Sequence, residues 1–573
     1  MKRLSCITIL ILLINVIQTI AQAPPWLWAK SAGHGNAIFS VGEHITTDIN
    51  GNVFVSGEFN DSIIFGSFIF GEFSSSGVFI VKYDQNGNVV WADSPIRGGL
   101  NNSITITGLS NDIQGNLYVI GTIKNTIIFG SDTLRSNSGG EDIFLLKYNP
   151  AGILLWAKCT GGIGNESPSD IALDESGHLY LAGSFCNTSA STKDTLIFAN
   201  DTLTCAGLNV YSKFIAKFDT AGNAIWGRSS TSSGGGVISV TTDRSGSPNI
   251  YVTSIFITDS ITFGNITLHN DTTDGSGDLF IAKYDSSGHI LWALSNGGPN
   301  REYAGEIVTD VSDNIYTSGS FSSPDIVFGN DTLHNAGASN SYDMYIAKYD
   351  SSGNSLWAKS VGGAGNDYSI SSLAIDTYQN VYVSGMFASG SISFDGHSLI
   401  NNCGCNGNLF IAKYDAAGNA LWAKGTTGDG AVFPMSMAID ATSGDLYQTG
   451  NLAQTFPSFP SPWPVAFDHD TINALSTHVY FVAKLGPTVL DVPFLYSSNG
   501  DVLVYPNPST SVFYFRDKSK QEIKQIEIRN VIGQHILTSA KNEIDLSGFS
   551  AGIYFYSVTT REGKILNGKV VKQ

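Results

Sequence analysis

Residues 280–293 read FIAKYDSSGHILWA, and this stretch decides the fold. Its first part, an apolar run that ends in Lys–Tyr–Asp, has the β-branched and aromatic residues that fit a half-buried strand. The Ser–Ser–Gly that follows predicts a tight turn, because Gly supplies the positive φ that a hairpin requires. The run around Trp292 then predicts a second strand that returns beside the first.

The same hairpin recurs along most of the chain, at spacings of 63 to 70 residues between successive tryptophans. These tryptophans are Trp28, Trp91, Trp156, Trp226, Trp292, Trp357 and Trp422. The lysines that correspond to Lys283 are Lys82, Lys147, Lys217, Lys283, Lys348, Lys413 and Lys484. Both series count to seven, which indicates seven repeated units.

Each unit has two further strands before the hairpin. The first ends in an Asp, a short turn such as Gly115–Asn116 follows, and the second reads like Val381–Gly385. The strand-ending aspartates are Asp48, Asp112, Asp174, Asp243, Asp310, Asp376 and Asp440. We name the four strands A to D in chain order. Such units cannot each bury two faces alone, whereas radial packing around an axis satisfies all of them. The sequence therefore predicts an all-β protein built on a seven-bladed β-propeller.

The seventh unit lacks a strand D after Lys484. The segment Trp26–Lys30 has the Trp-Ala sequence of a strand D but no preceding hairpin partner. We therefore expect residues 26–30 to complete the seventh blade and to remove an exposed strand edge. A solenoid is the competing repeat architecture, and its terminal units would be capped instead of complementary.

A second pattern lies between strands B and C of each unit, where a Phe precedes a turn rich in Gly, Asn and Asp. These residues are Phe65, Phe129, Phe198, Phe263, Phe328, Phe394 and Phe467. Apolar flanks around such a turn predict a small extra hairpin. In a propeller the B–C and D–A connections share one face, which we name the loop face. Its connections vary most, and binding surfaces usually lie on variable loops.

The repeated Asp and Lys each have a chemical and a structural interpretation. The Asp with its Gly–Asn could belong to a calcium loop, but the further oxygen ligands and the bidentate Glu of an EF-hand are missing. We interpret it as a turn in which Asp accepts a backbone N–H. The repeated Lys lies in an otherwise apolar strand, which predicts pairing with a neighbouring carboxylate instead of seven catalytic amines.

Charge restricts the partners. The chain has 573 residues and a net charge of −18, and only 14% of its residues are charged. Residues 22–487 contain 19 Lys and Arg against 41 Asp and Glu, or −22, whereas residues 501–573 contain 10 against 7, or +3. An acidic field of this kind repels phosphate backbones and anionic lipid, so nucleic-acid binding is not expected. Cations, cationic surfaces and glycans are better candidate partners.

The first residues predict export. Lys2 and Arg3 precede an apolar run from Leu4 to Ile20, followed by small residues, which is the layout of a secretory signal peptide. We expect cleavage after Ala21, because cleavage after Ala23 would place a proline directly behind the cut. No other stretch reaches the roughly 18 to 20 apolar residues of a membrane span, so no transmembrane span is expected in the mature chain.

Five cysteines remain after the signal peptide, and an odd number argues against a disulfide-scaffolded fold. Cys186 and Cys205 fall in one insert and could pair in an oxidising compartment. Cys403 and Cys405 could form half of a soft-metal site, but no second pair at zinc spacing accompanies them. No cofactor is expected, with a divalent cation as the weaker alternative.

The repeated units resemble a bacterial β-propeller repeat family whose hallmark is a Gly-Asn-x-Tyr-Val-x-Gly string. Residues 115–121 read GNLYVIG and match it closely. The turn departs from the pattern at Gly246–Asn249, and it lacks the Gly at Asp313–Asn314 and Gln379–Asn380. The resemblance covers residues 26–485 and implies a propeller fold, but such repeats serve unrelated functions.

The repeat stops near Pro487, and residues 488–500 read as a linker. Five expected strands at 502–504, 512–515, 526–529, 552–558 and 565–571 predict a small β-sandwich. The segment closely resembles the type A sorting domain of the bacterial type IX secretion system. The residues that carry this resemblance are Pro506, Asn507, Pro508, Gly533, Gly552, Tyr554 and Lys569.

This second resemblance implies that residues 501–573 engage the type IX secretion machinery. The signal peptide would take the chain to the periplasm, and the C-terminal domain would direct it across the outer membrane, for release or attachment to the cell surface. A carbohydrate-binding or adhesive sandwich domain is the alternative interpretation, although fold alone does not assign function.

Candidate ligand groups lie in the polar D–A connections of the loop face. They are Asn165, Glu166, Glu302, Asn366, Asp367 and Tyr368. No serine nucleophile elbow, zinc-protease motif or phosphate loop is present. We therefore expect an exported binding or adhesion protein instead of an enzyme. The alternative is a secreted polysaccharide hydrolase or lyase that uses carboxylates of the loop face, because paired Asp and Glu can divide acid and base roles.

Overall fold

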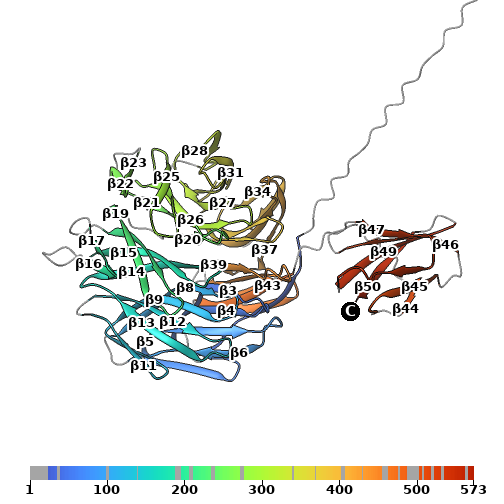
Figure 1. Ribbon diagram of the computed structural model, residues 1–573, viewed down its shortest axis with the longest axis horizontal. Helices are drawn as coiled ribbons and strands as arrows, with labels where there is room; N and C mark the ends of the chain where they lie inside the picture. The colour runs from blue at the N-terminus through green and yellow to red at the C-terminus, as the bar shows by residue number, and fades with distance from the viewer. Residues whose placement is uncertain are drawn as a thin grey trace, which may run out of the picture. The chain divides into compact units, whose positions relative to one another are not determined.

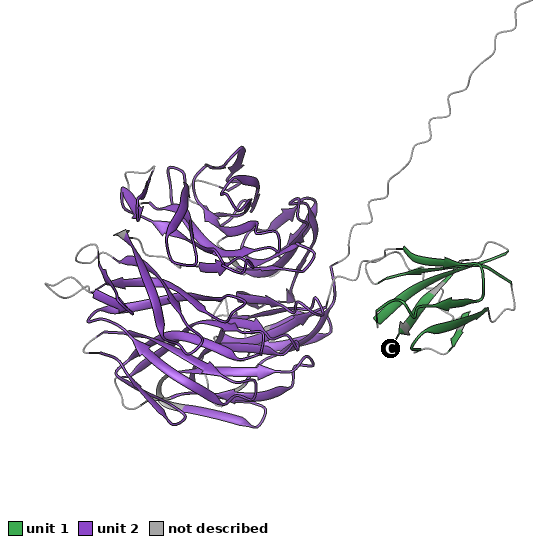
Figure 2. Ribbon diagram, viewed as in Figure 1, with its two compact units in different colours: residues 1–22, 488–573 green, residues 23–487 purple. Residues whose placement is uncertain are grey.

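The protein was analysed as a computed structural model. The structure describes residues 23–34, 39–97, 102–137, 140–186, 195–205, 211–233, 239–270, 276–337, 341–367, 369–401, 407–428, 430–453, 463–474, 478–486, 502–505, 509–517, 522–530, 535–550, 552–561 and 565–572. The chain divides into two compact units, one of residues 23–487 and one that contains residues 488–573 (Figure 2). Residues 1–22, with the expected signal peptide, lie outside the described residues.

The larger unit repeats one antiparallel sheet. A typical sheet has the strands β26 (Glu302–Thr309), β27 (Ile315–Phe321), β30 (Asp343–Tyr349) and β31 (Ser355–Val361), paired in that order. They are strands A to D of one unit. Between B and C lies a separate hairpin of β28 (Asp325–Phe328) and β29 (Asp331–His334), as the Phe pattern predicted. The sheets follow one another in chain order around the unit (Figure 1).

The other sheets of this unit keep the same order of strands. The first four in the chain are β3 (Ser40–Thr47), β4 (Val53–Phe65), β5 (Phe68–Tyr83) and β6 (Val89–Asp93); β8 (Ser103–Asn111), β9 (Leu117–Lys124), β12 (Asp142–Tyr148) and β13 (Leu154–Thr160); β14 (Asn165–Leu173), β15 (Leu179–Cys186), β18 (Ser212–Phe218) and β19 (Ala224–Ser233); and β20 (Ser239–Thr242), β21 (Ile250–Phe256), β24 (Asp278–Tyr284) and β25 (Ile290–Asn296). The last two are β32 (Ser369–Ile375), β33 (Val381–Phe387), β36 (Asn408–Tyr414) and β37 (Ala420–Gly425); and β39 (Ala431–Ile439), β40 (Leu446–Ala453), β43 (His478–Leu485) and β1 (Trp26–Lys30).

Short strands accompany these sheets on the B–C side. The hairpins are β10 (Thr126–Phe129) with β11 (Asp132–Arg135), β16 (Thr195–Phe198) with β17 (Asp201–Thr204), β22 (Ser260–Phe263) with β23 (Ile266–His269), β34 (Ser391–Phe394) with β35 (His397–Ile400), and β41 (Trp463–Phe467) with β42 (Asp470–Ala474). The two-residue strands β2 (Gly33–His34), β7 (Ile96–Arg97) and β38 (Thr427–Gly428) extend three of these layers. In the first unit, the extra hairpin is continuous with β4 and β5.

Seven such sheets are found among the described residues, and they close into a ring. The last sheet is completed by β1, which pairs antiparallel with β43 from Lys30 opposite Val482 to Trp26 opposite Leu485. The innermost strands of the last and first sheets also meet, because Thr47 Oγ1 donates to the Ile439 carbonyl at 3.0 Å. The fold is therefore an all-β propeller, closed by the two ends of the repeated region.

A β-bulge marks the innermost strand A of each sheet whose described residues include that position, as at Gly42/His44 and Pro168/Asp170. The bulge turns a carbonyl of strand A toward a Gly of strand B. A Cβ on Gly57 would overlap the Val41 carbonyl, and one on Gly121 would overlap that of Thr105. The final Gly of the repeated string is thus required by close backbone approach.

Hydrogen bonds of strand A also connect neighbouring sheets around the central axis. At four junctions a side chain of one sheet accepts a strand A backbone N–H of the following sheet, as Asp170 does from Val240 (2.9 Å) and Glu306 from Leu373 (2.6 Å). Ser239 and Ser372 accept in the same way from Ile307 and Met437. Burial raises the pKa of Glu306 to about 8 and that of Asp170 to about 6.

On the opposite face the strand-ending Asp folds the A–B turn, which confirms the turn interpretation. Asp112 Oδ1 accepts the N–H groups of Gln114 (3.1 Å) and Asn116 (2.9 Å), and its Oδ2 accepts from Tyr118 (3.2 Å). The Lys of strand C completes this group, with Lys147 Nζ 3.4 Å from Asp112. The predicted pairing of Lys with a carboxylate is confirmed here. The same ion pair recurs at Lys82–Asp48, Lys348–Asp310 and Lys413–Asp376, and Lys484 pairs with Asp445 instead of Asp440.

The same Lys and the repeated Trp also donate hydrogen bonds to the next blade. Lys283 Nζ (2.8 Å) and Trp292 Nε1 (3.3 Å) both donate to the Ser351 carbonyl in the C–D turn of the following sheet. The equivalent shared carbonyls belong to Pro150, Ser286, Ala416 and Gln85. The turn glycine packs on the Trp ring, as Gly353 does on Trp292. We name this arrangement the Lys/Trp clamp.

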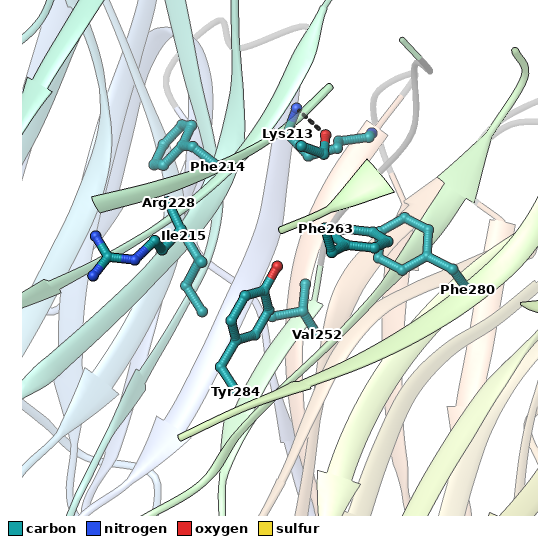
Figure 3. A pocket seen from close by; sticks show the side chains of 9 residues that line it. Lys213, Phe214, Ile215, Arg228, Val252, Phe263, Phe280 and Tyr284 are labelled. Carbon is teal, nitrogen blue, oxygen red and sulfur yellow. Dashed lines mark hydrogen bonds between the residues drawn. The ribbon is translucent and has the colours of Figure 1, made fainter. Parts of the chain in front are cut away.

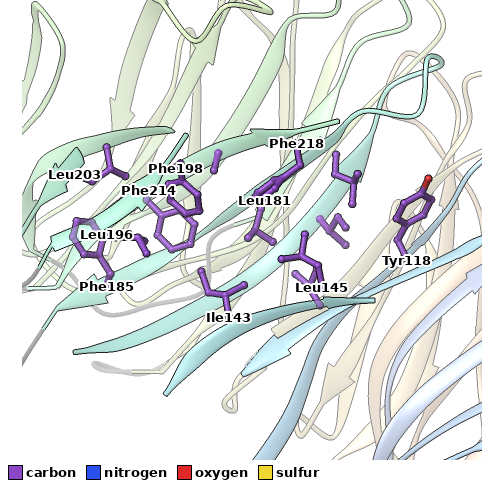
Figure 4. Packing of buried hydrophobic residues seen from close by; sticks show 14 of the residues in the cluster. Tyr118, Ile143, Leu145, Leu181, Phe185, Leu196, Phe198, Leu203, Phe214 and Phe218 are labelled. Carbon is purple, nitrogen blue, oxygen red and sulfur yellow. The ribbon is translucent and has the colours of Figure 1, made fainter. Parts of the chain in front are cut away.

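Apolar side chains fill the space between neighbouring sheets. One such layer contains Ile143 and Leu145 of one sheet, and Leu181, Phe198 and Phe214 of the next (Figure 4). Because each layer draws residues from two sheets, no sheet has a complete core of its own. Burial of this kind stabilises by roughly 25 cal/mol per Å² of apolar surface, so stability depends on every junction of the ring.

The smaller unit is a β-sandwich with two sheets. One sheet has β44 (Val502–Tyr505), β45 (Val512–Asp517) and β48 (Glu543–Asp545); the other has β47 (His535–Ser539), β46 (Ile523–Arg529), β49 (Gly552–Thr560) and β50 (Ile565–Lys572). Side chains of both sheets form one core, in which the rings of Phe515 and Tyr556 lie 5.0 Å apart. The predicted sandwich is confirmed, although β47 and β48 were not expected from the sequence.

The ring predicts a large effect of the N-terminal strand. In β1, Trp28 is buried and donates to the Gln85 carbonyl at 3.1 Å, whereas its neighbour Leu27 is half exposed. We expect Trp28→Ala to lower the free energy of unfolding by about 3 to 5 kcal/mol and Leu27→Ala to change it by less than about 0.5 kcal/mol. Denaturant unfolding measures both, and equal effects of the two substitutions would contradict closure by β1.

A second prediction concerns the A–B turns that lack Gly. Asp313 and Gln379 take the glycine conformation, with φ of 61° and 65°. Because a Cβ is unfavourable there, we expect Gln379→Gly to raise the free energy of unfolding by about 0.5 to 1 kcal/mol. Gln379→Ala is the control: it keeps the Cβ and loses only the hydrogen bond to Ser312. The interpretation is wrong if the Gly variant is no more stable than the Ala variant.

Candidate functional site

Three of the D–A connections on the loop face contain a buried acid that accepts a hydrogen bond from within its own loop. We name this acid the bracket acid and its hydrogen-bonded loop the bracket. An acidic side chain lies at the start of strand A and accepts the N–H of a glycine four residues earlier: Glu166 from Gly162 at 3.0 Å, and Asp367 from Gly363 at 2.8 Å. Glu302 has the equivalent position after Gly298 and accepts a hydrogen bond from Ser323. All three acidic side chains are fully buried. They therefore shape the loops from inside.

A second carboxylate lies beside each bracket, at the first residue of strand C in the preceding blade. These residues are Asp142, Asp278 and Asp343, and each is at most 1% exposed. The point where a Cβ on Gly161 would stand lies 2.6 Å from both Asp142 Oδ1 and Glu166 Oε2, so the two carboxylates meet at this glycine. We name each Asp with its bracket acid a junction pair.

Burial and a neighbouring like charge raise the pKa of one acid in two of the junction pairs. Burial raises the pKa of Glu302 to about 8, and the charge of Asp278 adds to this effect. Burial likewise raises the pKa of Asp343 to about 6, with Asp367 adding to it. At the remaining pair, Cys159 lies against the acids, and burial followed by the Asp142 charge raises its pKa to about 12. That thiol is therefore unreactive near neutral pH.

The structure places the other predicted ligand residues in the same loops. Asn165 Oδ1 accepts the N–H of Glu141 at 3.0 Å, and Asn366 Oδ1 that of Tyr342 at 3.3 Å. Tyr368 lies outside the described residues. The five described residues thus lie at three separate junctions: Asn165 with Glu166, Asn366 with Asp367, and Glu302 alone. Whether they bind a ligand remains a prediction.

An exposed cluster on the same face was not found from the sequence. The Tyr303 side chain follows Glu302 and is 39% exposed, and its ring centre lies 5.6 Å from that of Tyr342. The Arg301 guanidinium lies 6.0 Å from the Tyr303 ring, and its Nη1 donates to the Tyr303 hydroxyl at 3.3 Å. We name Arg301, Tyr303 and Tyr342 the aromatic cluster. Only the pairing of strands from different connections brings them together.

A small cavity lies elsewhere, between two neighbouring blades. Phe214, Ile215, Phe263 and Phe280 line it, together with the stem of Lys213, whose backbone N–H donates to Ser230 Oγ (Figure 3). Its volume of about 10 Å³ has room for about one water molecule. Burial lowers the pKa of Lys213 to about 8. This cavity is too small for a ligand.

Three of the five cysteines lie among the described residues. Cys186 and Cys205 form a disulfide, and Cys159 is a free thiol. Cys403 and Cys405 lie outside the described residues. Within the described ranges, no group of three or more His, Cys, Asp or Glu side chains could hold a metal ion.

In the smaller unit, the structure describes three of the predicted sorting residues. Gly552 begins β49 opposite Lys572, Tyr554 is buried and donates to the Ser550 carbonyl at 2.8 Å, and Lys569 is exposed opposite Phe555. Pro506, Asn507, Pro508 and Gly533 lie outside the described residues. The final strands therefore form one ladder that ends at the terminal basic segment.

Comparison with known proteins identifies the smaller unit. Residues 503–573 match the family described as the secretion system C-terminal sorting domain. This domain marks a protein that the type IX secretion system exports to the cell surface or the medium, and it implies engagement with that machinery. Among the described residues, no helix is long and apolar enough to cross a membrane.

Two curated proteins resemble longer parts of the chain. An uncharacterized WD repeat-containing protein of Acanthamoeba polyphaga mimivirus is 24% identical over 517 residues, which cover 75% of this chain and 36% of that protein. The regulatory protein FlaEY of Caulobacter vibrioides is 26% identical over 135 residues, or 23% of this chain and 14% of that protein. The chain thus spans only about a third or less of the length of these relatives.

Solved structures show only distant likeness. A puromycin-hydrolyzing peptidase of Mycobacterium tuberculosis aligns with a TM-score of 0.37 at 9% identity, over 90% of this chain and 58% of that one. A lignostilbene dioxygenase of Pseudomonas brassicacearum aligns with a TM-score of 0.32 at 11% identity, over 80% of this chain and 91% of that one. The activities that these names describe belong to those proteins.

The division into two units predicts the result of a truncation. The last strand of the larger unit, β43, ends at Leu485. We expect a chain that ends at Gly486 to keep its folded propeller and to accumulate in the periplasm of a host with the type IX apparatus. Cell fractionation and thermal unfolding measure this outcome. Export of the truncated chain to the surface or medium would show that residues 503–573 are not needed for sorting.

Proposed function

We propose that this is a non-catalytic binding or adhesion protein whose ligand, a glycan, contacts the aromatic cluster of the loop face. A signal peptide at residues 1–21 starts the export, residues 22–487 form the ligand-binding propeller, and a linker at 488–500 leads to the sorting domain at 501–573. The propeller units belong, in this proposal, to the bacterial repeat family with the Gly-Asn-x-Tyr-Val-x-Gly string.

The single observation that carries the proposal is the exposed Tyr303 beside Tyr342 and Arg301. Tyrosine offers a large, rigid apolar face with a polar tip, and it is enriched in binding surfaces for that reason. A guanidinium adds five hydrogen-bond donors for hydroxyl or carboxylate oxygens. The bracket of Glu302 below fixes the loop that presents these groups, and a preorganised site loses less entropy on binding.

The alternative, a polysaccharide hydrolase or lyase, needs two carboxylates that a substrate can reach. The junction pairs are close together, but their side chains are at most 1% exposed and accept hydrogen bonds from the loops. Burial of these acids supports binding over catalysis. The residues Asn165 and Asn366 remain candidate ligand groups at the two junctions that lack the cluster.

The proposal predicts a localised loss of binding. In calorimetry with a panel of neutral and acidic oligosaccharides, we expect Tyr303→Ala to weaken the affinity for any bound glycan at least tenfold, or about 1.4 kcal/mol. Tyr378, which is 63% exposed on the A–B turns of the opposite face, provides the control Tyr378→Ala. Equal loss in both variants, or tight DNA binding at moderate salt, would contradict the proposal, and release of reducing ends from a glycan would favour the hydrolase.

A further inference from the structure

The junction pairs are distributed unevenly around the ring. Three junctions have an Asp five residues before the repeated Lys, a Gly five residues after the repeated Trp, and a bracket acid at the start of strand A. These sets are Asp142, Gly161 and Glu166; Asp278, Gly297 and Glu302; and Asp343, Gly362 and Asp367. Where the Asp is replaced by Asn408, the Gly becomes Thr427 and the bracket acid becomes Val432. The three residues therefore change together.

Backbone pairing shows that these positions are equivalent. The N–H of Asp367 donates to the Tyr342 carbonyl and that of Val432 to the Gly407 carbonyl, in both cases the residue before the strand C position. Because the acid-free junction forms the same backbone bond, the carboxylates are not needed merely to build the loop. A Cβ on Gly362 or Gly297 would overlap the carboxylate of Asp343 or Asp278. The glycine is therefore required by the acid beside it.

Hydrogen bonding shows that the two acids of a pair differ. At the third junction, Asp367 accepts four donors at 2.7 to 3.0 Å: the N–H groups of Gly363, Ala388 and Ser389, and the Ser389 hydroxyl. Asp343 Oδ2 accepts one, the N–H of Ala336 at 2.7 Å, and its Oδ1 is buried with no hydrogen-bond partner among the described residues. The oxygens of Asp367 are thus fully engaged by donors, whereas Asp343 is short of donors.

Simultaneous ionisation of two neighbouring carboxylates that are so deeply buried is strongly disfavoured, because desolvation and mutual repulsion both penalise the second charge. A proton on Asp343 Oδ1 removes the second charge and turns an orphan acceptor into a donor toward its neighbour. The four N–H and O–H donors around Asp367 argue against a metal ion there, since a cation would face the same groups.

We propose that each junction pair holds a single proton and acts as a pH-sensitive latch on its D–A loop. While the proton is bound, a carboxylic acid–carboxylate hydrogen bond holds the loop against the preceding blade. When the proton leaves, two buried anions repel each other and the loop opens. The junction at Asn408 and Val432 has no such pair, and its loop stays closed at every pH.

The titratable groups beside each junction pair are consistent with one shared proton per pair. Asp343 meets Asp367 as its charged neighbour, and Glu302 meets Asp278, with the Tyr345 hydroxyl also near Glu302. Cys159 faces the pair of Asp142 and Glu166. Since the pKa values of Asp343 and Glu302 are raised to about 6 and about 8, the stabilisation is complete below about pH 4 and is lost as pH rises through these values.

Hydrogen exchange of the full chain tests the latch. Exchange rates, corrected for the intrinsic pH dependence, would be compared at pH 5 and pH 8.5 for peptides covering 361–367 and 425–432. We expect protection of the first segment to fall on the order of tenfold or more, since one pKa unit corresponds to a tenfold change, and protection of the second to stay constant. Equal pH responses of the two segments would overturn the proposal without any variant.

A substitution of Asp343 tests whether the proton of the pair causes the pH response. Asp343→Asn supplies a permanent N–H donor in place of the O–H, so we expect it to keep residues 361–367 protected at both pH values. Asp395→Asn, at an exposed hairpin aspartate of the next blade, serves as the control and should leave the pH response unchanged. Persistent pH dependence in Asp343→Asn would overturn the proposal, as would restoration of protection at pH 8.5 by calcium, which would make the pair a cation site.

Discussion

The structure depends on a backbone carbonyl that, among the described residues, five of the blades offer to the preceding blade. The Trp91 indole and the Lys82 ammonium of one blade converge on the C–D turn carbonyl of the next, and the same ammonium pairs with Asp48, the aspartate that folds its own A–B turn. A single Lys thus joins turn formation within a blade to docking between blades. Since each apolar layer also draws on two sheets, no blade is complete without its neighbours.

Much of this architecture could be predicted because it depends on short-range chemistry that repeats. The turn glycines, the alternating strands and the period of the Trp residues each have a local signature, and strand β1 was recognisable by its Trp-Ala sequence. The reason for the strand B glycine could not be predicted, because it is the close approach of a carbonyl from the bulged strand A. Such a cause is invisible until two strands are paired.

The candidate site was harder to predict for the same reason. The polarity of Glu166, Glu302 and Asp367 suggested exposed ligand groups, whereas the structure buries all three beneath the loops that they hold. The aromatic cluster comes from two connections, Arg301 and Tyr303 from one and Tyr342 from the other, and only strand pairing places them side by side. Burial is set by tertiary contacts, so a carboxylate in a loop sequence gives no indication of whether it faces solvent or its own backbone.

Closure of the ring by β1 also determines the order in which the sheets of the propeller can fold. The N–H of Ala29 reaches the carboxylate of Asp470 across 441 residues of chain, and β1 pairs with β43 over a similar separation. Contacts of such long range carry the largest entropic cost of loop closure and form late. Six sheets can assemble as the chain emerges into the periplasm, but the ring stays open until its last repeated strand has crossed. The sorting domain follows that strand in the chain, so it is completed only after the strands that close the propeller.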